Sequence, residues 1–102
     1  MTKIYIEKNR NRYKLYAEGH ATGSNKVCAA VSILTHTVYG YLMNSKDIYV
    51  SVNKLEPEKA KASFEWYGEK AAQAVYDMAL IGFLSLEMAE SKYISVEYIN
   101  KN

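Results

Sequence analysis

The sequence predicts an α+β fold, a two-layer sandwich in which two helices cover one face of a mainly antiparallel or mixed sheet of about five strands. Three observations support this class. Five short segments alternate apolar and polar residues, which is the period of a strand with one buried face. Two longer segments place apolar residues three or four positions apart, which is the period of an amphipathic helix. The segments follow the order ββαββαβ, which favours two helices on one face of a single sheet.

The chain opens with a predicted hairpin. Apolar and polar residues alternate on both sides of the turn sequence Asn9-Arg10-Asn11, and the second strand, Tyr13 to Glu18, ends at Gly19-His20. The period then changes. Apolar residues three and four positions apart predict a helix from Val27 to about Met43, which Gly40 weakens slightly.

A second hairpin and a second helix follow. Two alternating segments, Ile48 to Asn53 and Ala60 to Trp66, flank the turn sequence Glu56-Pro57-Glu58. A long helix is expected from Glu69 to Glu90, with Ala72, Val75, Ala79, Gly82, Leu86 and Ala89 on one stripe. Alternation returns from Tyr93 to Ile99, which predicts the closing strand.

Length and composition limit the classes of function. A chain of 102 residues suits one hydrophobic core, so residues 1–102 are expected to form a single domain. With 49% hydrophobic and 24% charged residues, the composition is that of a soluble globular protein. One cysteine and two histidines are too few for a structural zinc site, and no phosphate-binding glycine loop is present. We therefore expect no metal and no cofactor.

The cysteine count and the hydropathy pattern bear on location. A single cysteine excludes an internal disulfide framework and fits a reducing compartment. The N-terminal residues Met1 to Glu7 lack the apolar region of a signal peptide. The most apolar run, Met78 to Leu86, is far shorter than the roughly 20 residues that cross a bilayer. We expect a cytoplasmic protein that does not bind membranes.

Ten tyrosines and a basic run raise the question of a nucleic-acid partner. The favoured interpretation is that the tyrosines pack half-buried on strand faces, so no such partner is expected. The cations Lys8, Arg10, Arg12 and Lys14 are interpreted as a solvated edge that discourages aggregation. If the even-numbered residues share a face, contact with RNA or an acidic segment is the alternative.

The segment from Gly19 to Ser32 contains the candidate chemistry. It holds Cys28, the only cysteine, and His20, one of two histidines. A thiol and an imidazole form a nucleophile and a base when the fold brings them together. Asn25 is a good helix N-cap, which makes Cys28 the third helical residue. There the helix dipole and free N–H groups favour the thiolate. A buried, inert core cysteine is the alternative.

Three further residues have two interpretations each. Ser32 lies one turn after Cys28 and bonds either near the thiol or to its own backbone. Asn25 is expected to act as the cap rather than as the third member of a catalytic triad. His36 is a rival base, but it lies ~12 Å from Cys28 along one helix, so we expect a solvated or packing role.

These residues also carry a family resemblance. The segments Gly19-His20-Ala21 and Val27-Cys28-Ala29-Ala30-Val31-Ser32-Ile33-Leu34 resemble the signature of the ribosomal-processing cysteine protease (Prp) family. Its members are small bacterial proteins that remove an N-terminal extension from a large-subunit ribosomal protein. More weakly, Ile81 to Glu87 and Tyr93 to Val96 resemble the family's last helix and closing strand. The connector between the histidine and the cysteine is shorter than the family usually has, and Asn25 stands where an aspartate is usual.

Residue chemistry and resemblance together predict a cysteine endopeptidase. Cys28 would attack the scissile carbonyl, and His20 would generate the thiolate and later protonate the leaving amine. N–H groups of the first helical turn, including that of Cys28, would hold the oxyanion. The connector Ala21 to Ser24 contains a flexible glycine and is expected to close over a bound peptide.

The resemblance implies a short peptide extension as substrate, read around apolar or aromatic residues. Two sources are considered: a ribosomal protein and a phage structural protein of the capsid or scaffold. The alternative function is a catalytically silent peptide-binding or dimerising module with the same fold. The shortened connector would be its trace in the sequence.

A homodimer is also expected. The second helix carries Leu80, Ile81, Phe83 and Leu84 in addition to its core-facing stripe. In a two-layer domain one side of each helix stays uncovered, and an exposed apolar patch usually marks an interaction site. Closed two-fold dimers are the commonest way to cover one. The alternative is that neighbouring loops cover these residues.

Overall fold

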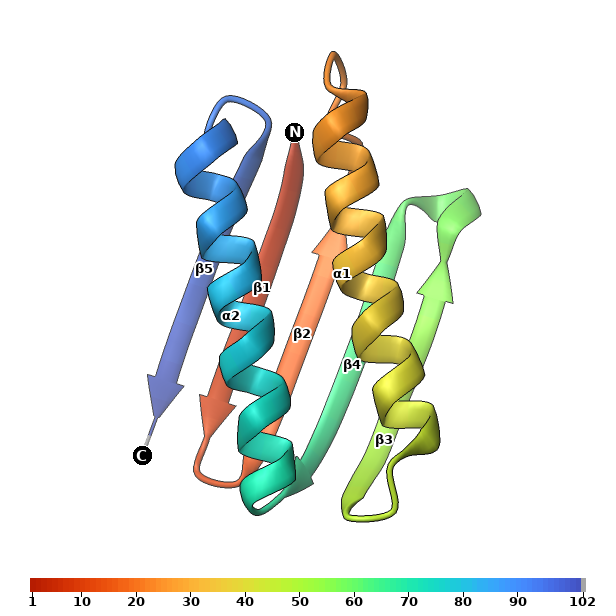
Figure 1. The fold of residues 1–102 in the computed structure, drawn as a ribbon, viewed down its shortest axis with the longest axis vertical. Helices are drawn as coiled ribbons and strands as arrows, with labels where there is room; N and C mark the ends of the chain where they lie inside the picture. The colour runs from red at the N-terminus through yellow and green to blue at the C-terminus, as the bar shows by residue number, and fades with distance from the viewer. Residues whose placement is uncertain (102) are drawn as a thin grey trace.

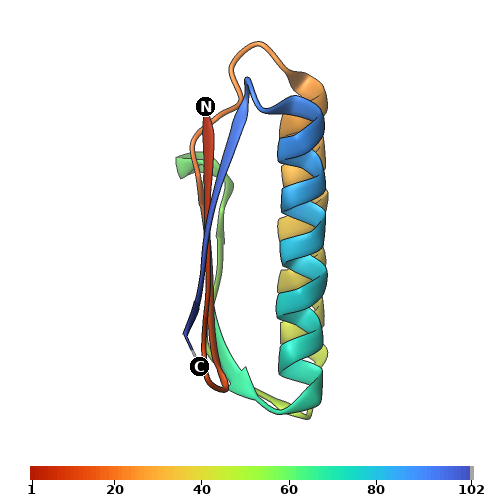
Figure 2. The ribbon, with the colours of Figure 1, turned by 90° about the vertical axis from the view of Figure 1, so that its left-hand side faces the viewer.

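The computed structural model describes residues 1–101 as two layers, a five-stranded sheet with two helices on one of its faces (Figures 1 and 2). This confirms the predicted α+β sandwich and the order ββαββαβ. In chain order the elements are β1 (Thr2–Asn9), β2 (Arg12–Glu18), α1 (Asn25–Asn44), β3 (Ile48–Glu56), the 3-10 turn η1 (Pro57–Lys59), β4 (Lys61–Gly68), α2 (Lys70–Glu90) and β5 (Ile94–Lys101).

The strand order explains why both helices lie on the same face. The order across the sheet is β3-β4-β2-β1-β5, and every pair is antiparallel except β1 with β5. The chain crosses from β2 to β3 through α1, and from β4 to β5 through α2, in opposite directions across the sheet. Because β2 and β4 are themselves antiparallel, two right-handed crossovers in opposite directions cover the same face. In the part of the chain that the structure describes, neither α-helix lies on the other face of the sheet (Figure 2).

The core lies between the two layers and is rich in aromatic residues. Phe64, Trp66 and Phe83 are its largest fully buried side chains, and Ile6 and Leu15 pack beside them. The indole N–H of Trp66 donates to the carbonyl of Ala72 at 3.0 Å, which ties β4 to the first turn of α2. The ring of Tyr13 stacks on that of Trp66, with 5.6 Å between the centroids. This network satisfies the one polar group that the tryptophan brings into the core.

The buried face of α2 differs from the predicted stripe. Ala72, Val75 and Ala79 are buried as expected, whereas Ala89 is exposed and Leu86 half-buried. Phe83 was assigned to the surplus apolar surface, and this is wrong: its side chain is 0% exposed. Ile81 is 66% exposed and so lies on the outer side of the helix. Phe83 follows Ala79 by four residues, so it lies on the same side of α2 as Ala79 and Ala72 and faces the sheet with them.

The open face of the sheet holds several of the tyrosines. The rings of Tyr5 and Tyr16 stack there, with 6.0 Å between their centroids. The hydroxyl of Tyr5 donates to Glu7, and this bond, with burial, raises the pKa of Tyr5 to about 12. Burial and a hydrogen bond to Glu65 raise the pKa of Tyr16 to about 12 as well. The expectation of half-buried tyrosines on strand faces therefore holds for Tyr5 and Tyr16 but not for the whole set, because Tyr39, Tyr41 and Tyr76 lie on the helices.

Strand register divides the basic run between the two faces. Lys8 is paired with the buried Tyr13, so it belongs to the helix-covered face. Lys14 is paired with Glu7 and Glu65 on the open face, between two carboxylates. The alternative in which these even-numbered cations share one face is therefore wrong. The favoured interpretation as an edge strand is wrong as well, because β1 and β2 both lie inside the sheet. Separately, neither helix in residues 1–101 is long and apolar enough to cross a membrane.

The position of Phe83 gives a stability prediction. Phe83→Ala is expected to lower the free energy of unfolding by about 3–5 kcal/mol, because it opens a cavity in the centre of the core. Ser85→Ala, two residues later on the exposed side of the same helix, is the control and is expected to change it by less than about 0.5 kcal/mol. Urea unfolding followed by circular dichroism measures both. Equal effects would contradict the assignment of Phe83 to the core.

Candidate active site

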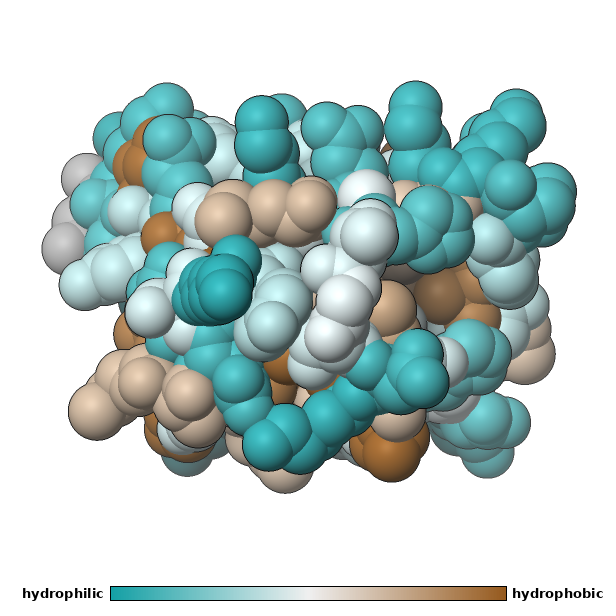
Figure 3. All heavy atoms as spheres, turned by 90° about the horizontal axis from the view of Figure 1, so that it is seen from above, coloured by the Kyte–Doolittle hydropathy of each residue, from teal (hydrophilic) through white to brown (hydrophobic). Residues whose placement is uncertain are grey.

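A cleft of about 200 Å³ opens between the first half of α1, the end of β2 and the turn at η1. Both His20 and Cys28 line this cleft, although they come from different elements. Figure 3 views the molecule from above and shows a mostly hydrophilic surface with apolar atoms visible between the polar ones. The predicted pair of thiol and imidazole therefore belongs to one site.

His20 follows a tightly held stretch of backbone. The N–H of Gly19 donates to the carbonyl of Ala60 at 2.9 Å, and its carbonyl accepts from the hydroxyl of Thr2 at 3.1 Å. Gly19 has φ +93°, and a Cβ there would lie 2.6 Å from the carbonyl oxygen of Met1. Only glycine fits this position. The backbone immediately before His20 is therefore fixed to β1 and to the start of β4.

The helix that carries Cys28 begins one residue earlier than expected. Ser24, not Asn25, is the N-cap: its backbone is extended and its hydroxyl accepts from the N–H of Val27 at 3.2 Å. Serine and asparagine are about equally good caps, so the sequence does not separate them. The preceding turn decides, because Gly23 has φ +95° and the N–H of Ser24 donates to Ala21. Cys28 is consequently the fourth helical residue rather than the third.

This shift changes which backbone N–H groups of the first turn lack an acceptor within the helix. The N–H of Cys28 donates to the carbonyl of Ser24 at 3.2 Å, and that of Val27 is taken by the cap. The expectation that the Cys28 N–H holds the oxyanion is therefore wrong. The N–H groups of Asn25 and Lys26 precede the first intrahelical bond, and they are the donors that the first turn offers.

The thiol contacts the connector rather than the imidazole. Cys28 is half-buried, and its Sγ lies 3.8 Å from the carbonyl oxygen of Ala21, to which the S–H donates. Within residues 1–101 no hydrogen bond joins Cys28 to His20. His20 is exposed at the mouth of the same cleft. The structure thus shows the thiol and the imidazole on one cleft in an unpaired arrangement.

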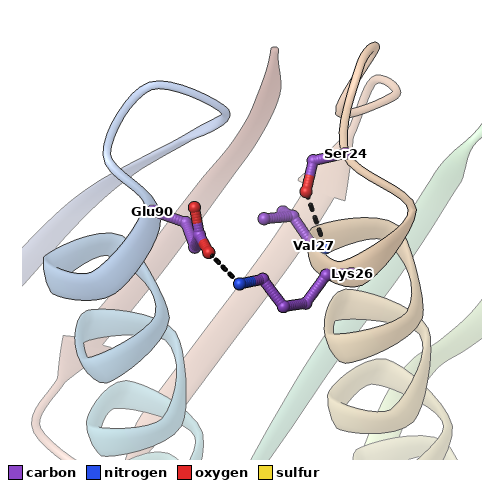
Figure 4. A network of polar contacts seen from close by, with 4 residues as sticks. All are labelled: Ser24, Lys26, Val27 and Glu90. Carbon is purple, nitrogen blue, oxygen red and sulfur yellow. Dashed lines mark hydrogen bonds and ion pairs between the residues drawn. The ribbon is translucent and has the colours of Figure 1, made fainter.

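An ion pair and an aromatic ring flank the connector. Lys26 Nζ lies 2.6 Å from a carboxylate oxygen of Glu90, joining the start of α1 to the end of α2 (Figure 4). This carboxylate raises the pKa of Lys26. Each charge lies at the unfavourable end of its own helix dipole, so the pair offsets both mismatches. A Cβ at Gly23 would lie 3.4 Å from the ring of Tyr93.

Ser32 and His36 line the same cleft as Cys28. Nδ1 of His36 lies 2.8 Å from the carbonyl oxygen of Ser32 and 3.4 Å from its hydroxyl oxygen. His36 is exposed, which fits the expected solvated role, but its location at the cleft was not predicted. The axial distance from Cys28 does not show that both residues lie on the same side of the helix. The spacing of two i, i+4 steps between them was the available signal. Residues 1–101 contain no cluster of three or more His, Cys, Asp or Glu side chains placed to hold a metal ion.

A thiol in the first turns of a helix and an imidazole at a strand end, on one cleft, are the groups of a thiol-dependent hydrolase. The model of the family described as cysteine protease Prp matches residues 1–95, so the chain belongs to this family. It is therefore a cysteine protease by family, and the resemblance seen in the sequence is confirmed. No functionally curated protein sequence matches the chain.

Solved structures share the fold across nearly the whole chain. SMU.848 from Streptococcus mutans has a TM-score of 0.76 and 18% identity, covering 99% of this chain and 96% of that one. A ribosomal processing protease Prp from S. aureus, in complex with a covalently linked product peptide, has a TM-score of 0.75 and 17% identity. The same S. aureus protease with a substrate peptide has a TM-score of 0.73 and 15% identity. Both S. aureus matches cover 96% of this chain and 99% of theirs.

The corrected N-cap gives a second prediction. Ser24→Ala is expected to lower the free energy of unfolding by about 1 kcal/mol, because the N–H of Val27 loses its acceptor. Asn25→Ala is the control and is expected to be nearly neutral, since Asn25 is the first helical residue rather than the cap. Thermal unfolding of both variants measures the difference. A larger loss from Asn25→Ala would contradict the observed cap.

Proposed function

We propose that this chain is a cysteine endopeptidase that removes an N-terminal extension from a ribosomal protein, with Cys28 as nucleophile and His20 as base. The observation that carries the proposal is the single cleft that both side chains line, in a member of a cysteine protease family. The S. aureus structures with substrate and covalently linked product peptides support a peptide as the occupant. A lone thiol that must stay reduced, and a ribosomal substrate, favour the cytoplasm as its location.

In the proposed reaction His20 removes the proton from the Cys28 thiol, and the thiolate attacks the scissile carbonyl carbon. A C–S bond forms, the C–N bond breaks, and the imidazolium returns the proton to the leaving amine. Water then hydrolyses the thioester with His20 again as base. The negative oxygen of each tetrahedral intermediate would accept from the N–H groups of Asn25 and Lys26, which the helix leaves without intrahelical acceptors.

This reaction requires a rearrangement of the connector. The thiol must leave the carbonyl of Ala21, and the imidazole of His20 must approach it. Gly19 is held on both sides, so the movement is confined to the residues between it and the capped helix. We propose that peptide binding drives this closure over the cleft, as loop closure does in many enzymes. Ser32 lines the cleft and would lie along the bound peptide, and Asn25 would act through its backbone N–H.

Two alternatives are defined by what the chain would do instead. In the first, the substrate is a phage structural protein, and the same chemistry would remove an extension from it. A catalytically silent peptide-binding module would keep the fold and leave Cys28 unreactive. The specific observation in favour of the silent module is the thiol's contact with Ala21 in place of His20. Reactivity of the thiol therefore separates the two functions.

The catalytic pair gives the third prediction. Iodoacetamide is expected to alkylate Cys28 faster in the folded protein than in the same protein unfolded in urea, because in the fold a movement of the connector would let the His20 imidazole take the thiol proton. Cys28→Ser is expected to abolish cleavage of bacterial ribosomal proteins with N-terminal extensions, followed by mass spectrometry. His20→Ala is expected to slow it by about 100- to 10,000-fold. Alkylation slower than in urea would indicate the silent module, and full turnover by Cys28→Ala would end the protease proposal.

We also propose a homodimer, on a surface that differs from the one expected. Phe83 is in the core, but the outer sides of the two helices expose Ile33, Tyr41, Met78, Ile81 and Met88. A groove of about 360 Å³ runs between the helices and is lined mainly by apolar side chains. From Val27 to Asn44 the sequence has no Asp, Glu, Lys or Arg, and neither does Met78 to Leu86. A second copy presents the same uncharged face, so a two-fold dimer covers both.

The fourth prediction tests this surface. Ile81→Lys is expected to convert the dimer to a monomer, because it places a cation in the centre of an uncharged interface. Tyr49→Lys is the control, since Tyr49 is 70% exposed and lies on the face of the sheet opposite the two α-helices. Light scattering at micromolar concentration measures the mass of each. A monomeric parent protein, or a dimeric Ile81→Lys variant, would contradict the proposed interface.

A further inference from the structure

The cleft extends along α1 beyond the proposed catalytic pair. Cys28, Ser32 and His36 are spaced four residues apart, so they lie one above the other on one side of the helix, and all three line the cleft. The proposed mechanism uses Cys28 and leaves His36 without a role. A polar side chain placed on the peptide path is a candidate for substrate recognition.

The hydrogen bonds around His36 settle which ring nitrogen is available. Its Nδ1 lies 2.8 Å from the carbonyl oxygen of Ser32, and a carbonyl can only accept, so Nδ1 carries the hydrogen. In the neutral ring Nε2 is then an acceptor with a free lone pair. The neighbouring Thr35 hydroxyl is used by the helix itself, because it donates to the carbonyls of Val31 and Ser32.

The opposite wall of the cleft supplies apolar contacts and a neutralised charge. Leu55 and Pro57 line it, and Glu56 between them lies 3.2 Å from Lys59. A side chain entering here meets apolar surface along its stem. Near His36, Glu56 is paired with Lys59 and the Thr35 hydroxyl is bonded to backbone, so Nε2 of His36 is an acceptor that the cleft offers to an incoming group. Glu18, two residues before His20, lines the cleft as well.

The distance from the thiol fixes the substrate position. Cys28 and His36 lie about 12 Å apart along the helix axis at 1.5 Å per residue. An extended peptide rises about 3.3 Å per residue, so a chain running from Cys28 along α1 reaches His36 after three or four residues. Which peptide position His36 contacts is therefore set by helix geometry.

We propose that His36 is a specificity-determining residue of this protease. Its Nε2 accepts a hydrogen bond from a substrate side chain that ends in an amide, hydroxyl or ammonium donor, three or four residues from the scissile bond. Side chains ending in a carboxylate lack the donor and are disfavoured there. The inference rests on the proposed function, because it names the substrate class of that same cleft.

The experiment profiles cleavage of a proteome-derived peptide library by mass spectrometry. The wild-type protein is expected to enrich donor side chains at one position, three or four residues from the cleaved bond. His36→Phe keeps an aromatic ring without an acceptor and is expected to reduce this enrichment by a few-fold to about tenfold. His36→Gln keeps an acceptor oxygen and is expected to retain it. Asn44→Ala is the matched control, because Asn44 makes the same i−4 contact on α1 outside the cleft.

Each outcome bears on one of the two proposals. Loss of the enrichment at that position alone in His36→Phe, with other positions unchanged, supports the assignment. Cleavage by His36→Phe with the wild-type profile, or the same change in Asn44→Ala, overturns it and leaves the proposed function intact. Absence of cleavage by the wild-type protein, together with slow alkylation of Cys28, overturns the proposed function and this inference with it.

Discussion

The site depends on the fixed point where the chain leaves β2. At Gly19 the N–H is bonded to the start of β4 and the carbonyl to the hydroxyl of Thr2 in β1, while Met1 leaves no room for a side chain. Three strands therefore determine the direction in which His20 departs from the sheet. Without this anchor the short connector would let the imidazole and the thiol vary in relative position, and acid–base catalysis depends steeply on such geometry.

The topology then explains why one face of the molecule carries all the candidate functions. Because both crossovers cover the same side of the sheet, the start of α1 comes beside the end of α2, where Lys26 and Glu90 pair. The cleft opens between α1 and the sheet, and the uncharged groove runs between the helices. The proposed peptide site and the proposed dimer interface therefore lie on different sides of α1, so the proposed dimer would leave the cleft open.

The comparison of sequence and structure separates local from non-local information. Alternation and helical periodicity predicted every helix and strand, because burial on one face is imprinted in the local pattern. The predicted N-cap, Asn25, is wrong by one residue, because serine and asparagine are both good caps. The turn that ends at Ser24 decides between them, and the composition of the segment does not reveal it. Helical spacing places Phe83 on the side of Ala79, and His36 on the side of Ser32 and Cys28, so the local pattern held part of this information. Which side of α1 borders a cleft is a tertiary property, and the sequence pattern does not contain it.

The connector between His20 and Cys28 couples three tasks. Ala21 provides the carbonyl that holds the thiol and also accepts from the N–H of Ser24, whose hydroxyl caps the catalytic helix. A peptide that displaces Ala21 therefore frees the thiol and loosens the turn before the cap in one movement. Under the proposed mechanism the unpaired arrangement is a resting state. The Cys28 thiol gives up its hydrogen bond to the Ala21 carbonyl and pairs with the His20 imidazole only when the connector moves. A short connector suits this coupling, since few residues can absorb the displacement without transmitting it to His20.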